Sequence, residues 1–108
     1  MNRVTKLAIL EVAFNHNRWV RLEVGGESLI SLIAHHVCIE PTDGFIYLYL
    51  FKSMDLDKGF DRAITFPIGQ LDKVVNVEIL EKPAVDLEDL LKLHNRFPDS
   101  SSFDVVAL

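Results

Sequence analysis

Histidine and cysteine are the residues of this chain whose side chains could carry acid–base or metal chemistry. His35 and His36 are neighbours in a predicted strand, so their side chains point to opposite faces and cannot hold one ion together. His36 could act as an acid or base, because histidine titrates near neutral pH, but no nucleophile motif accompanies it. Cys38 is the only cysteine, which excludes an internal disulfide and a thiolate metal cage within one chain. We therefore expect no metal and no cofactor, and a non-catalytic protein rather than an enzyme.

The most suggestive constellation is aromatic and lies on the longest uninterrupted apolar stretch. On one face of a strand it would align Phe45, Tyr47, Tyr49 and Phe51. Tyrosine combines an apolar body with a polar tip, so Tyr47 and Tyr49 suit an interface or a small-molecule pocket. The alternative is that this face is covered by a C-terminal helix, in which case the residues packed on it would be Leu90, Leu91 and Phe97.

A second candidate contact face lies in residues 18–24. This segment alternates, so Trp19, Arg21 and Glu23 share one face, and a surface Trp beside Arg is typical of a contact hot spot. The complete set of candidate ligand or interface residues is Trp19, Arg21, His36, Tyr47, Tyr49, Arg62, Phe103 and Val105.

Two helices are expected to flank the strands that carry these residues. Residues 4–14 fit either a helix or a strand, and good helix formers together with a possible cap at Asn2 favour the helix. The second helix begins at Asp86, which can cap it, and ends before Pro98.

Five strands are expected between the helices, at residues 18–24, 28–40, 45–51, 62–66 and 74–80. Gly25 and Gly26 supply the positive φ angles of a tight hairpin. The strand at 28–40 would span roughly 43 Å if it were flat, so it must bend or bulge in a small domain. In the last strand, alternation places Val75, Val77 and Ile79 on one face.

These elements predict an α+β, mainly β fold. We expect a small, strongly curved antiparallel barrel or half-barrel of about five strands with an N-terminal and a C-terminal helix. Residues 1–98 would form one globular domain, and residues 99–108 a flexible linker of serines followed by an apolar strand-like tail.

Composition excludes several classes of partner. Acidic residues outnumber basic ones by 16 to 11, so the net charge of −5 offers no general attraction to nucleic acid. The apolar runs are shorter than the roughly 18 residues that a membrane span needs, and polar residues interrupt any signal-like stretch near the start. We expect a cytoplasmic protein that contacts neither membrane nor nucleic acid.

The order of elements resembles that of an Sm-like or SH3-like small barrel, and residues 7–80 resemble two families in more detail. Residues 45–48 resemble the Trp-Tyr-Leu signature of the WYL domain, a ligand-sensing module of bacterial regulators, and residues 66–71 resemble a later stretch of that family. Ile46, Pro67 and Gln70 stand where that family has its Trp and two arginines. Residues 10–16, 21–24 and 71–73 are similar to the Rho-inhibiting antiterminator family.

We therefore expect a binding or assembly module that associates with itself through apolar strand surfaces, as a dimer in preference to larger oligomers. The apolar tail at residues 103–108 is predicted to pair with a strand edge, and the flexible linker before it favours the edge of a neighbouring copy. The alternative function is a small-molecule sensor, or a minor enzyme, that uses the aromatic face with His36.

Overall fold

The computed structural model describes residues 1–39, 46–53, 62–81, 85–99 and 103–105; at positions 35–39, 46–48 and 105 it describes the backbone alone. The fold is α+β and mainly β, as the sequence predicts. Its elements are α1 (Arg3–Asn15), β1 (Trp19–Val24), β2 (Glu27–Ile39), β3 (Ile46–Ser53), β4 (Arg62–Pro67), the 3₁₀ turn η1 (Ile68–Lys73), β5 (Val74–Ile79), α2 (Leu87–Arg96) and β6 (Asp104–Val105).

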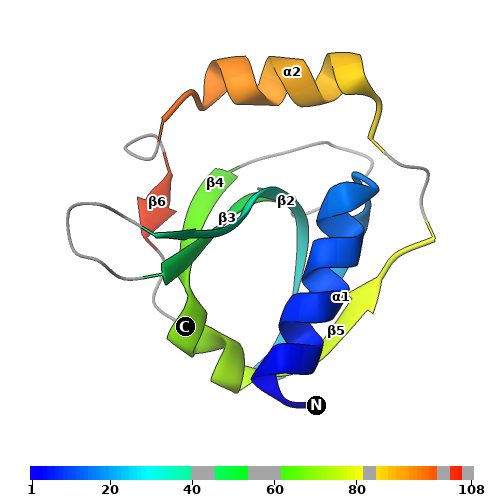
Figure 1. Cartoon of the computed structure of the whole chain (residues 1–108), viewed down its shortest axis with the longest axis vertical. Coiled ribbons are helices and arrows are strands. Elements are labelled where there is room, and N and C mark those ends of the chain that lie inside the picture. Colours follow the sequence, from blue (N-terminus) through cyan, green and yellow to red (C-terminus); the bar gives the residue numbers. More distant parts are fainter. Residues whose placement is uncertain (40–45, 54–61, 82–84, 100–102, 106–108) are drawn as a thin grey trace.

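The strands form one open sheet in the order β5-β1-β2-β3-β4-β6. Neighbouring strands from β5 to β4 are antiparallel, and the two-residue β6 adds to β4 in parallel. Figure 1 shows the strands curving round, with α1 beside β5 and α2 lying across one end. The expected five-stranded half-barrel with a helix at each end of the chain is confirmed.

Local sequence signals begin both helices as expected. The side chain of Asn2 accepts a hydrogen bond from the Thr5 backbone N–H at 2.8 Å, which settles residues 4–14 as helix. The side chain of Asp86 accepts one from the Asp89 N–H at 2.9 Å. Each cap satisfies a backbone donor that the first turn of a helix leaves without an intrahelical partner.

The predicted hairpin and the predicted bend are both present. Gly25 and Gly26 have φ angles of +57° and +83°, the left-handed values that allow β1 to turn directly into β2. The pairing of β2 with β3 shifts register between Ile33 and His35 and again between His35 and Cys38. These irregularities let a strand of 13 residues curve within a small sheet.

Side chains on the two faces of the sheet build two separate apolar clusters. The first cluster, packed under α1, consists of Leu10, Ala13, Val20, Leu22, Ile33, Leu50, Ile64, Phe66, Leu71, Val74 and Val77. The second cluster, packed under α2, consists of Trp19, Leu32, Ala34, Tyr49, Phe51, Ala63, Leu80, Leu93 and Phe103. The central strand β3 contributes to both, so both of its faces are covered.

Strand β5 differs from the alternation predicted for residues 74–80. Between β1 and β5 the register shifts after Glu23, so that Val24 pairs with Val74 and Val75 is left as a bulge. As a result Val74 and Val77 are buried, while Val75 is 69% exposed. The prediction that Val75, Val77 and Ile79 share one face is therefore wrong, because an extra residue resets the period of two.

The described part of the C-terminal segment, residues 103–105, joins the sheet of its own chain, and residues 106–108 of the predicted tail lie outside the described residues. Ile64 and Thr65 of β4 pair with Asp104 and Val105, and the Phe103 side chain is buried in the second cluster. The expectation of pairing with a neighbouring copy is thus not what the structure shows. Because the Phe103 side chain is buried, it anchors the segment within its own chain.

Candidate functional site

The described part of the predicted aromatic face, Tyr49 and Phe51, is covered by side chains of the same chain, while Phe45 and the Tyr47 side chain lie outside the described residues. Tyr49 is 5% exposed and Phe51 is fully buried. The Phe103 ring meets the Tyr49 ring edge-on, with 5.2 Å between centroids, and the Phe51 ring at 5.7 Å. Phe97, the residue that directly follows α2, has its ring centroid 5.8 Å from that of Phe51 and 6.1 Å from that of Phe103. These separations are typical of packed aromatic rings, so this face is a core.

The predicted covering by α2 is confirmed, with one change in the residues that provide it. Leu93 is buried and Leu90 packs on the second cluster, but Leu91 is 53% exposed. The ring of His94 also packs edge-on against Phe51, at 5.3 Å between centroids. The difference arises because residues 90, 93 and 97 share one side of the helix, whereas residue 91 lies toward its flank.

Trp19 is not the exposed hot-spot residue that its neighbour Arg21 suggested. It is 8% exposed and belongs to the second cluster. Leu80, which follows β5 and whose N–H donates to the Trp19 carbonyl at 2.9 Å, belongs to the same buried cluster. The prediction of a surface contact at Trp19 is therefore wrong.

The two arginines among the predicted contact residues are exposed and form ion pairs across strands. Arg21 of β1 lies opposite Glu78 of β5 and contacts it at 3.1 Å. Arg62 of β4 contacts Asp104 of β6 at 3.4 Å. Exposed pairs of this kind contribute about 0–1 kcal/mol, so they secure register more than they stabilise the fold.

Three predicted contact residues, His36, Tyr47 and Val105, have side chains outside the described part of the structure. Their backbones lie in β2, β3 and β6. Among the described side chains, no group of three or more metal-binding residues comes together. No described helix is long and apolar enough to cross a membrane.

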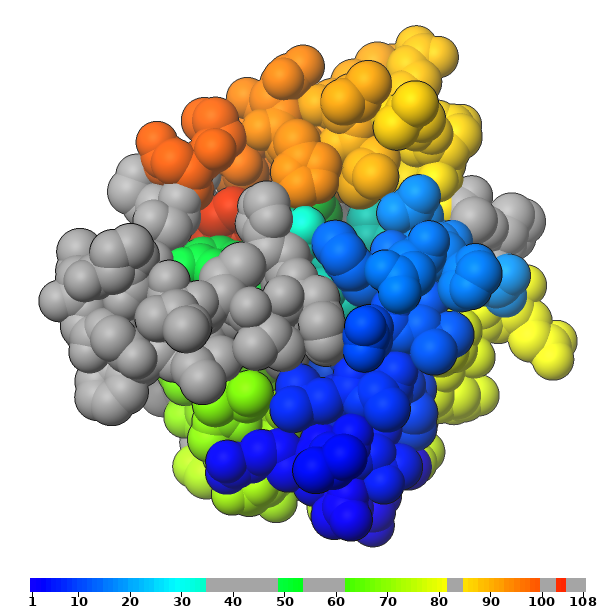
Figure 2. Space-filling model, viewed as in Figure 1, coloured from blue at the N-terminus to red at the C-terminus, as the bar shows by residue number. Residues whose placement is uncertain are grey.

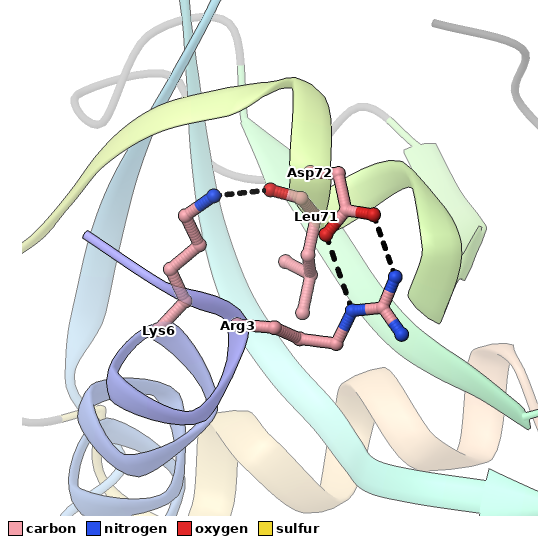
Figure 3. A network of polar contacts seen from close by, with 4 residues as sticks. All are labelled: Arg3, Lys6, Leu71 and Asp72. Atoms are coloured by element: carbon pink, nitrogen blue, oxygen red, sulfur yellow. Dashed lines mark hydrogen bonds and ion pairs between the residues drawn. The ribbon is translucent and has the colours of Figure 1, made fainter.

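A polar network that the sequence reasoning missed joins α1 to η1 (Figure 3). Lys6 is 5% exposed, and its Nζ donates to the Leu71 carbonyl oxygen at 2.6 Å. Beside it, Arg3 binds both carboxylate oxygens of Asp72, at 2.6 and 3.2 Å. The signal for Lys6 was its place among the apolar residues of α1, where a lysine must bury its stem and find an acceptor.

Among the described carboxyl groups, that of Asp72 has a shifted pKa because of its pair with Arg3. The hydrogen bond from Arg3 lowers the pKa of Asp72 below its ordinary value, and the charges of Arg3 and Lys6 act in the same direction. Both side chains of the pair are well exposed, at 45% for Arg3 and 63% for Asp72. We interpret the network as a tie that holds η1 against α1.

Exposed apolar side chains occur on α1 and on the neighbouring strand β5. Val4 and Val12 of α1 are 76% and 50% exposed, Ala8 lies between them on the same face, and Val75 protrudes from the bulge in β5. Helix α1 packs directly on β5, the last strand of the sheet on that side as far as the chain is described. We call Val4, Ala8, Val12 and Val75 the α1–β5 side.

In the view of Figure 2, α1 (blue) lies at the surface of the molecule, below the orange atoms of α2. Exposed apolar side chains that occur together, rather than singly, are typical of interaction surfaces. The α1–β5 side is therefore the candidate functional site, and its chemistry suits contact with another apolar surface.

Comparison with known proteins adds no name to this site, since no family model, no curated protein and no solved structure matches the chain.

Proposed function

We propose that this protein is a non-catalytic assembly module that binds a second copy of itself through the α1–β5 side. The observation that carries the proposal is the exposure of Val4, Val12 and Val75 on two elements that pack together at one end of the sheet. Leaving such side chains in water forgoes burial worth roughly 25 cal/mol per Å² of apolar surface. A second copy offers the same apolar surface and would recover that burial on both sides.

The edge position of β5 supports the same reading. An edge strand presents backbone N–H and C=O groups that can pair with another chain. The bulge at Val75 interrupts the regular ladder of β5 and turns an apolar side chain outward instead. Association through side chains is thus favoured over extension of the sheet by strand pairing.

The alternative function, a small-molecule sensor built on the aromatic face, has less support. A ligand at Tyr49 and Phe51 would have to displace Phe97 and Phe103, which fill that face. The filled face therefore favours assembly. We expect no rise in the unfolding temperature when small aromatic or anionic compounds are added, and a specific rise would favour the sensor.

The proposal also includes the fold relationship, the location and the kind of partner. A helix, five curved strands and a 3₁₀ turn before the last of them support an Sm-like relationship. The single cysteine and the net charge of −5 support a cytoplasmic module, of bacterial type by its resemblances, that associates with protein rather than with nucleic acid.

Light scattering coupled to size-exclusion chromatography tests the proposal. The proposal predicts a mass that rises from the 12.3 kDa of one chain toward twice that value as the protein is concentrated. A mass that stays at 12.3 kDa up to about 500 μM would refute it, because even small interfaces with micromolar dissociation constants would be populated there.

A further inference from the structure

The outward face of α1 is unusual for a helix on the surface of a small domain. Such helices normally carry charged residues on the side that faces water. In α1, Lys6 is buried and Arg3 is bound to Asp72, so Glu11 is the one remaining charge of the helix. The exposed residues of the helix that share the outward face are Val4, Thr5, Ala8, Glu11, Val12 and Asn15.

These positions are arranged symmetrically about Ala8. At 100° per residue, Val4 and Val12 lie about 40° to either side of Ala8, one turn before it and one turn after it. Thr5 and Glu11 likewise lie about 60° to either side. Because residues 4 and 12 are both valine, an antiparallel partner related by a two-fold axis at Ala8 would set valine against valine.

We propose that α1 packs against α1 of a second copy, antiparallel and around a two-fold axis that passes at Ala8. This inference rests on the proposed self-association and names the surface that makes the contact. The two Ala8 residues meet at the axis, where their small side chains let the helices approach to the usual 8–10 Å between axes. Val4 of each copy then interdigitates with Val12 of the other.

The charges of the helix fit this arrangement. The two-fold axis brings Glu11 of each copy beside the first turn of the other helix, on the side from which Arg3 projects. That first turn contains no acidic residue, and the positive end of the helix dipole favours an anion there. Antiparallel helices also place opposite ends of their dipoles side by side. Glu11 therefore specifies the antiparallel orientation, since a parallel pair would bring the two Glu11 carboxylates together.

The size of the contact predicts its strength. One helix pair buries less than the roughly 1,200 Å² of a standard stable interface, so the dimer should dissociate in the micromolar range. Such a dimer forms and separates readily with protein concentration.

Three matched substitutions test which surface makes the contact. Val12→Glu puts a charge into the proposed interface, Val75→Glu makes the same change on β5, and Leu91→Glu makes it on the exposed side of α2. All three side chains are at least half exposed in the single chain, so the fold should tolerate each change. Circular dichroism establishes that each variant is folded before its mass is measured.

We expect Val12→Glu to weaken dimerisation by roughly tenfold or more, because it would bury an unpaired carboxylate in each half of the interface. Leu91→Glu should leave the dissociation constant unchanged. A dimer that survives Val12→Glu but is lost with Val75→Glu overturns the α1 pairing and leaves assembly through the α1–β5 side standing. A dimer that survives both of these changes but is lost with Leu91→Glu overturns the α1 pairing and the proposed surface together. A wild-type chain that stays monomeric overturns both.

Cross-linking provides a second measurement that does not require the interface to be broken. In Ala8→Cys the two new thiols face each other at the axis, so mild oxidation should give a covalent dimer within the distance a disulfide allows. The wild-type chain, whose single thiol is Cys38, is the control and should not cross-link under the same conditions. Failure of Ala8→Cys to cross-link in a sample that light scattering shows to be dimeric would overturn the two-fold at Ala8.

Discussion

Leu50 and Phe51 are adjacent in the chain and yet belong to different cores. Leu50 points into the first cluster beneath α1, and Phe51 into the second beneath α2, with neither exposed to solvent. The alternation of side chains along a strand requires this separation. It was predictable from the sequence, because both faces of the stretch around Leu50 are apolar and so both had to be covered.

Substitution of either residue should cost more than any change on the surface. Leu50→Ala is expected to reduce the free energy of unfolding by about 2–5 kcal/mol, and Phe51→Ala by about 3–5 kcal/mol. Denaturant unfolding followed by circular dichroism measures both. Leu87→Ala on α2 is the control, since truncating a side chain that is 67% exposed should change stability by no more than about 0.5 kcal/mol. A Leu50→Ala variant as stable as this control would show that β3 is not central.

The Arg3–Asp72 pair predicts a dependence of stability on pH. The pKa of Asp72 is lowered in the folded state, mainly by its hydrogen bond from Arg3, so the pair stabilises the fold above the unfolded pKa of about 3.9. That contribution is lost as the pH falls through the lower, folded-state pKa. The difference in unfolding midpoint between wild type and Asp72→Asn should therefore be largest near neutral pH and vanish in strong acid.

Arg3→Gln provides the matched control for this measurement. With the guanidinium removed, the substitution Asp72→Asn should have little further effect at neutral pH, because the two residues act as one pair. An equal effect of Asp72→Asn in both backgrounds would mean that the carboxylate acts through another group.

At the scale of elements, the sequence predicts regular segments well and irregular ones poorly. The cap at Asn2, the glycine hairpin and the helix from Asp86 were all found because each depends on local chemistry. The bulge at Val75 was missed, since nothing within residues 74–79 distinguishes it from a regular strand. Its cause is the pairing with β1, where Val24 takes Val74 as its partner.

The tail shows the same limit of local reasoning. Its strand character was predicted, but its partner was not, because a short apolar segment contains no information about which edge it will reach. In the structure the Phe103 ring is buried in the second cluster, where it contacts Tyr49 and Phe51. This burial is what fixes residues 104–105 on β4.

Phe103→Ala should therefore act as a core substitution and not as a change in a free tail. We expect it to reduce the free energy of unfolding by about 3–5 kcal/mol, as for other large aromatic truncations. Asp104→Ala, which removes only the exposed pair with Arg62, is the control and should cost at most about 1 kcal/mol. A Phe103→Ala protein with unchanged stability but a lower oligomeric mass would restore the idea that the tail binds a neighbour.

At the scale of the whole molecule, the two helices have different outward faces. Helix α2 has an exposed i,i+4 ion pair between Glu88 and Lys92, as is typical of the solvent-facing side of a surface helix. Helix α2 also exposes Leu87 and Leu91, whereas the outward face of α1 has Val4 and Val12 with Glu11 as its one charge. Which side of α1 faces inward could not be predicted from the sequence, because it depends on the sheet that the helix packs against. Lys6 lies on the inward side, but only the structure shows this, because its Nζ donates to the buried carbonyl of Leu71.

Small-angle X-ray scattering over a concentration series tests the assembly most directly, since it follows the unaltered chain in solution. The account predicts that forward scattering per unit mass doubles with concentration, and that the radius of gyration rises well above the 13.0 Å of the Cα atoms in one chain. Forward scattering that stays at the value for a single chain up to about 500 μM would contradict it, because a dimer of micromolar affinity would then be fully formed.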